Sequence, residues 1–160
     1  MKLTIILLAA LFAGTASFAA GATPTIAPAA PPPSQAEIVM PSSDVLIVLI
    51  RSTLDALNQA NITNNYTVLN GLGSISFAAN NPPAKLAMVF EPFRANGINL
   101  SGTLVTTPIL DQPAKIEQGR LLLVGHLETR PQVTRYNLIF EPTGGAWRIS
   151  DLNVSMTLAK

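Results

Sequence analysis

The chain contains no cysteine and a single histidine, His126, among its 160 residues. Without cysteine it forms no disulfide, thiolate zinc site or cysteine nucleophile, and it has no lipoprotein anchor cysteine. One histidine excludes every site that needs two, and the acids are scattered and form no ligand cluster. We therefore expect no metal site and no other cofactor.

Charge is also scarce. Charged residues make up 12% of the chain, against about 25% in an average protein. Such a composition argues against a highly solvated disordered chain and against a charge-laced coiled coil. The formal net charge of +1 provides no basic surface for nucleic acid. We expect no nucleic-acid partner.

The N-terminus has the pattern of a removable secretory signal. Lys2 precedes an uncharged apolar run over residues 5–13, and small residues follow up to Ala19, Ala20 and Ala22. The apolar run is shorter than the roughly 20 residues of a membrane span. We predict a signal peptide over residues 1–20, cleavage near Ala19/Ala20 or Ala22, and a secreted or periplasmic protein without membrane association. Removal of Lys2 leaves nine basic residues against nine acids.

Residues 21–37 are rich in proline and alanine. Proline lacks an amide donor and fixes φ, so this segment favours an extended polyproline II linker over a packed element. Pro28 and Pro31 also have the spacing of a ligand for a proline-binding domain, but no basic residue flanks them. We interpret the segment as a spacer before one folded domain over residues 38–160, which is long enough for a hydrophobic core.

The first half of this domain has helical periodicity. Pro41 and the cap residues Ser42 to Asp44 begin a helix expected to end near Ala60. Its apolar residues recur at intervals of three and four: Leu46, Leu49, Ile50, Leu54 and Leu57. A short helix is expected over residues 65–70. A third is expected to be capped by Asn81 and to end near Phe90, because Pro92 cannot continue it.

The second half has the features of antiparallel strands. We predict strands over residues 101–110 and 116–129, another from Pro131, and a last one from Trp147 to the C-terminus. The strand at 116–129 is apolar on both faces, which predicts cover on both faces. In the last strand the apolar parity changes after Ile149, which predicts a β-bulge near Ser150–Asp151. Helices followed by an antiparallel meander define an α+β fold.

Two motifs carry a resemblance to a known family. They are Pro131-x-Val133-x-x-Tyr136-x-Leu138-x-Phe140 and, after a glycine-rich turn, Gly145-x-Trp147-Arg148-Ile149. With the order helix, short helix, helix and meander, residues 42–160 resemble the nuclear transport factor 2-like superfamily, which includes ketosteroid isomerase and scytalone dehydratase. The resemblance implies a cone in which N-terminal helices pack on a curved sheet. The superfamily contains enzymes and non-catalytic domains, so it does not imply one activity.

The candidate site is a small apolar ligand pocket inside the cone. The residues assigned to it are Phe90, Phe93, Leu123, His126, Tyr136, Leu138 and Trp147. No acid shares the face of Tyr136, so we assign no catalytic residue and favour a non-catalytic module that binds a small apolar ligand or forms a homodimer through the sheet face. The alternative is a cofactor-independent lyase or isomerase that uses Tyr136 and His126.

Overall fold

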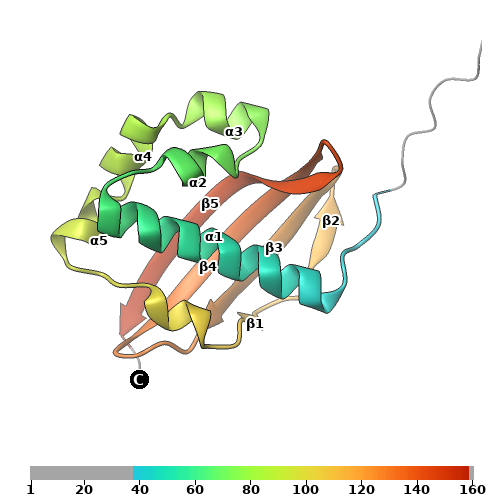
Figure 1. Ribbon diagram of the computed structural model, residues 1–160. Coiled ribbons are helices and arrows are strands. Elements are labelled where there is room, and N and C mark those ends of the chain that lie inside the picture. Colours follow the sequence, from blue (N-terminus) through green and yellow to red (C-terminus); the bar gives the residue numbers. More distant parts are fainter. Residues whose placement is uncertain (1–37, 159–160) are drawn as a thin grey trace, which may run out of the picture. The chain divides into compact units, whose positions relative to one another are not determined.

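The computed structural model describes residues 38–158. The predicted signal peptide (1–20) and linker (21–37) lie outside the described residues. Figure 1 shows an α+β arrangement in which helices come first and cover one face of a five-stranded antiparallel sheet. The strand order is β1-β3-β4-β5, and β2 also pairs with β3. The predicted fold class is therefore confirmed at the level of helices followed by an antiparallel sheet.

The long helix α1 spans Ser43–Thr63, three residues beyond the predicted end. Its apolar stripe faces the sheet, and Ile50, Leu54 and Leu57 are almost completely buried. The helix ends at Asn64, whose backbone is left-handed with φ 52°, a conformation that asparagine adopts more readily than most residues. The short helix α2 follows at Thr67–Gly71, close to its predicted range.

A helix that the sequence patterns did not indicate, α3, spans Ile75–Asn80. Its N-cap is Ser74, whose hydroxyl accepts a hydrogen bond from the backbone N–H of Phe77 at 3.2 Å. The next helix, α4, spans Pro83–Val89, and its N-cap is Pro82. The prediction that Asn81 caps this helix is thus wrong. Its side-chain amide instead donates to the carbonyl of Phe77 in α3.

The predicted interruption before Pro92 is confirmed. Helix α4 ends at Val89, and α5 (Glu91–Ala95) starts again with Pro92 in its first turn. At this position proline needs no backbone N–H partner and its fixed φ suits the helix. The aromatic rings on either side of the break pack edge to face, with the centroids of Phe90 and Phe93 5.7 Å apart.

The predicted strand over residues 101–110 is mostly wrong. Residues Ser101–Leu104 form a 3-10 helix, η1, and only Ile109–Leu110 form a strand, β1. The hydroxyl of Thr103 donates to the carbonyl of Leu100 at 2.7 Å, and that of Thr106 donates to Gly102 at 2.8 Å. These local bonds satisfy backbone groups without a sheet, so they override the β preference of threonine.

The segment predicted as one strand over residues 116–129 is a hairpin. It divides into β2 (Lys115–Glu117) and β3 (Arg120–Leu127), with Glu117 opposite Arg120. The two residues between them, Gln118 and Gly119, both have positive φ. Two such residues form the tight turn whose twist matches that of paired strands.

The sheet is completed by β4 (Gln132–Thr143) and β5 (Ala146–Leu158). The register shifts between the pairs Ile139–Asp151 and Phe140–Ile149, which leaves Ser150 as the additional residue. The predicted bulge is therefore confirmed. It explains why apolar side chains of β5 point inward on both sides of the parity change: Ile149 and Val154 are both buried.

The two faces of the sheet differ. The inner face, under the helices, carries the buried row Leu123, Leu127, Tyr136 and Leu138. On the outer face Leu122 and Val124 are only half-buried, and all helices in Figure 1 lie on the other side. The expectation of cover on both faces of this strand is wrong for the described part of the chain. Among these residues no helix is both long and apolar enough to cross a membrane.

Candidate functional site

Six of the seven residues predicted to line an apolar ligand pocket belong to the packed interior. Leu123, Leu138, Tyr136 and Phe90 are at most 5% exposed, and Phe93 and Trp147 pack against the same cluster. Side chains from α1 and the sheet occupy the space that the prediction reserved for a ligand. None of the seven residues lines either of the two surface pockets described below.

Tyr136 has a specific structural role in this interior. Its hydroxyl donates a hydrogen bond to the carbonyl of Ile109 in β1 at 3.1 Å. The phenol fits because Gly125 lies opposite it: a Cβ at that position would be 2.6 Å from the Tyr136 oxygen and 2.0 Å from the Ile109 oxygen. Burial, with a smaller contribution from the charge of Asp111, raises the pKa of Tyr136 from 10.0 to about 12.

His126 points to the opposite face of the sheet. It is paired with Arg135, whereas Tyr136 is paired with Gly125 one residue away, and neighbouring residues of a strand alternate between faces. The Nδ1 atom of His126 lies 2.6 Å from Asp111 Oδ1, and Arg135 lies 3.5 Å from the other carboxylate oxygen. The sheet therefore separates the two residues of the predicted lyase or isomerase pair.

This His126–Asp111–Arg135 cluster fastens the short strand β1 from outside. The backbone N–H of Asp111 donates to the carbonyl of Val124 in β3 at 2.9 Å. On the inner face, the hydroxyl of Tyr136 donates to the carbonyl of Ile109 in β1. All three side chains of the cluster remain partly exposed, so solvent screens their interaction. His126 therefore has a structural role, because its contact with Asp111 helps to keep β1 paired with β3.

A polar cluster that the sequence analysis missed lies at the end of α1. The hydroxyl of Tyr66 donates to Asn61 at 2.6 Å and accepts from Arg94 of α5 at 2.5 Å. The guanidinium of Arg94 also lies 5.6 Å from the centroid of the Tyr66 ring. Tyr66 is 1% exposed, so these bonds satisfy a buried hydroxyl and join α1 to α5. Arg94 lies 28 positions after Tyr66 in the sequence, and no local motif links the two.

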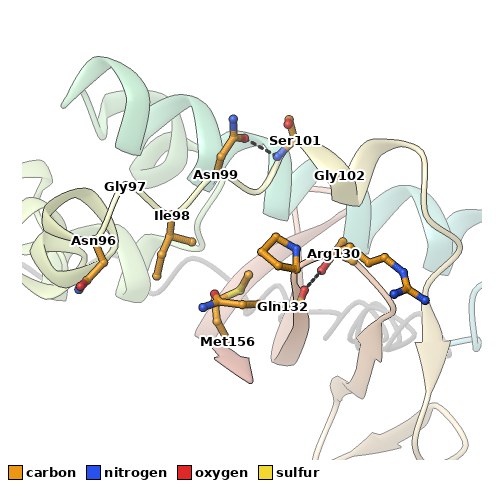
Figure 2. A pocket seen from close by; sticks show the side chains of 11 residues that line it. Asn96, Gly97, Ile98, Asn99, Ser101, Gly102, Arg130, Gln132 and Met156 are labelled. Atoms are coloured by element: carbon orange, nitrogen blue, oxygen red, sulfur yellow. Dashed lines mark hydrogen bonds between the residues drawn. The ribbon is translucent and has the colours of Figure 1, made fainter. Parts of the chain in front are cut away.

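A surface pocket lies at one end of the sheet, and we name it the end pocket (Figure 2). Its volume is about 720 Å³. One wall is the segment after α5, residues 96–102, and the other is the β3–β4 turn with Met156 of β5. Two hydrogen bonds shape these walls: Asn99 accepts from the backbone of Ser101 at 2.8 Å, and the Thr129 hydroxyl donates to the carbonyl of Gln132 at 2.6 Å.

The lining of the end pocket combines apolar and polar groups. Ile98, Pro131 and Met156 supply apolar surface, and the side chains of Asn96, Asn99, Gln132 and Ser101 supply hydrogen-bonding groups. Arg130 is its single charged residue, and no carboxylate lines it. The sequence analysis missed this pocket because its residues come from two loops and a strand end that are more than 20 positions apart.

A second pocket of about 510 Å³ runs along the exposed side of α1 and α2 and is lined in part by Ala56, Val68 and Leu72. Within residues 38–158 no three His, Asp or Glu side chains lie close enough to hold a metal ion. Comparison of the chain with protein-family models, with curated proteins and with solved structures finds no match.

Proposed function

We propose that this protein is a non-catalytic binding module that holds a small amphipathic molecule in the end pocket. The observation that carries the proposal is the combination of an apolar patch and several polar side chains around one space of about 720 Å³. Ligand pockets of small molecules typically measure about 300–1,000 Å³ and join apolar surface to a few polar groups. The ligand differs from the purely apolar one expected from the sequence, because the apolar interior is filled by side chains.

The chemistry of the end pocket favours binding over catalysis. General acid–base catalysis needs a group that exchanges protons near the working pH, such as histidine or a carboxylate. The one ionisable side chain of the lining is Arg130, and arginine keeps its proton. The alternative with Tyr136 and His126 loses support because these side chains face opposite sides of the sheet.

The sequence motifs support two further parts of the proposal. We place the domain in the nuclear transport factor 2-like superfamily, since helices precede a bulged antiparallel sheet as that resemblance implies. We also propose export through a cleaved signal peptide. N-terminal sequencing of the protein from cell fractions tests the export: a mature N-terminus near Ala20 or Ala22 supports it, and an intact N-terminus in the cytoplasm contradicts it.

Binding in the end pocket is tested by NMR spectroscopy. Hexanoate, hexanol and glucose are added separately to the isotope-labelled protein, and we expect at least one to shift the amide signals of Gly97, Gly102 and Gln132. The variant Ser101→Trp places a bulky ring at the lining and should abolish these shifts. The control Ser76→Trp, on exposed α3, should leave them unchanged. Absence of shifts with all three probes, or equal shifts in the Ser101→Trp variant, contradicts the proposal.

A further inference from the structure

The edge of β5 that faces away from β4 is only partly covered by other elements. Strand β5 pairs with β4 along one side. On its other side Ile149 donates its N–H to Leu72 at 3.2 Å and accepts from the N–H of Ser74 at 2.8 Å. Beyond Ile149, no main-chain hydrogen bond joins this side of residues 150–158 to another element within the described residues 38–158. The segment before α3 therefore covers only the first part of the edge.

The direction of the backbone groups follows from the bulge. Leu152 comes two positions after the additional residue Ser150. Its N–H bonds to the side chain of Asp151 at 2.8 Å and is therefore not used in the pairing with β4. Backbone groups alternate along a strand, so Val154 and Met156 also direct their N–H and carbonyl groups away from β4. The N–H and carbonyl groups of Val154 and Met156 form a row that another strand can pair with.

Most of this edge lacks the usual protection against pairing. Proteins protect edge strands with lysine, proline or bulges. The bulge of β5 lies at Ser150, and beyond it residues 152–158 contain no lysine, proline or acid. Their outward-facing side chains, Asn153, Ser155 and Thr157, are exposed and uncharged. The inward-facing residues Leu152 and Met156 are only half-buried. An added strand would therefore extend an apolar inner row and a neutral outer row.

We propose that the free edge of β5 pairs with the same edge of a second copy of this chain, antiparallel about Val154. In this register Val154 faces the partner's Val154, and Asn153 faces the partner's Ser155. The acidic Asp151 faces the partner's Thr157, so no like charges meet. The half-buried Leu152 lies beside the partner's Met156. The two sheets then join into one continuous sheet.

A second copy seated on the outer face is the less favourable arrangement. Stable interfaces bury about 800 Å² on each partner. The apolar side chains of that face are Ile109, Leu122, Val124, Val133 and Ile139, and all of them except Ile109 are already half-buried. Asn137, Asn153 and Arg135 of the same face are exposed and would lose water on contact. Edge pairing satisfies main-chain groups instead.

Paired charge substitutions on the edge test this proposal. Because Asn153 faces the partner's Ser155, Asn153→Lys with Ser155→Lys places like charges opposite each other, and Asn153→Glu with Ser155→Glu does the same. The mixed variant, Asn153→Lys with Ser155→Glu, places opposite charges there. The protein produced by cells expressing the full chain is studied by sedimentation velocity from about 5 µM to about 500 µM.

We expect the unsubstituted protein and the mixed variant to form dimers, and both like-charge variants to dissociate with a Kd raised at least about tenfold. The two like-charge variants control for Arg135, which is paired with Ser155 inside one copy and responds oppositely to lysine and glutamate. A monomeric unsubstituted protein overturns the proposal, as does equal weakening in all three variants. Dissociation by Val124→Lys with no effect of the edge variants would place the second copy on the outer face instead.

Discussion

Removal of the Tyr136 hydroxyl should change stability with opposite sign at neutral and at alkaline pH. At neutral pH the Tyr136→Phe variant loses the hydrogen bond to Ile109, which measures 3.1 Å. A net loss of about 1 kcal/mol is expected for a bond of this kind, because it leaves a partly buried carbonyl without its partner. The unsubstituted protein should therefore be the more stable of the two near neutrality.

The pKa of Tyr136 reverses this order as the pH rises. The phenol has a pKa of about 12 in the folded protein and 10.0 as its ordinary value, so the unfolded chain loses its proton first. The free energy of unfolding then falls as the pH rises above about 10, because the folded state binds more protons than the unfolded state. The loss amounts to about 1.4 kcal/mol at pH 11 and about 2 kcal/mol at pH 12. The phenylalanine variant has no such phenol and avoids this loss.

Urea unfolding of both proteins at about pH 8 and about pH 11 measures the change. The difference in free energy of unfolding should fall from about 1 kcal/mol in favour of the unsubstituted protein to zero or slightly below. Other alkaline titrations occur in both proteins and cancel in this difference. Phenolate absorbance of the folded protein provides a second readout, in which the variant should lack a transition near pH 12. A difference that stays constant with pH would refute the assignment of a buried, hydrogen-bonded phenol.

Two further substitutions test the packing around the site. Gly125→Ala should destabilise the fold by more than about 2 kcal/mol, because its Cβ would lie 2.0 Å from the oxygen of Ile109. The control Gly71→Ala has open space around its Cβ and should cost less than about 1 kcal/mol. Thermal unfolding compares the two variants, and similar melting temperatures would contradict the close approach at Gly125. Leu54→Ala should cost about 2–5 kcal/mol because this side chain is 0% exposed. Ile62→Ala, at 64% exposure, should cost about 0.5 kcal/mol or less, and urea unfolding would contradict the assignment if both cost the same.

The predictions from sequence succeeded where one local pattern decides the structure. The stripe of α1 and the break at Pro92 follow from periodicity and from the missing amide of proline, and the bulge at Ser150 follows from a change of side-chain parity. They failed at residues 101–110, where threonine hydroxyls bond to nearby carbonyls in place of a strand. Residue preferences are averages, and such local bonds override them.

The candidate site was harder to predict, since its position depends on which apolar side chains the core uses. Phe90, Tyr136 and Leu138 were correctly expected to point inward, but helix α1 fills the space between them and leaves no ligand pocket there. His126 was wrongly assigned to the pocket inside the cone, because it faces the outer side of the sheet. The residues around it, Asp111 and Arg135, became neighbours only through the pairing of three strands.

The sequence alone determined the α+β class of the fold, several inward-facing residues such as Tyr136 and Leu138, and the exclusion of thiolate and multi-histidine sites. These depend on composition and on the spacing of residues within one element. Only the tertiary structure decided that the interior is filled, that Tyr136 and His126 face opposite sides, and that an end pocket and a free β5 edge exist. Each of these depends on contacts between segments distant in the chain, which the spacing of residues within one segment does not fix.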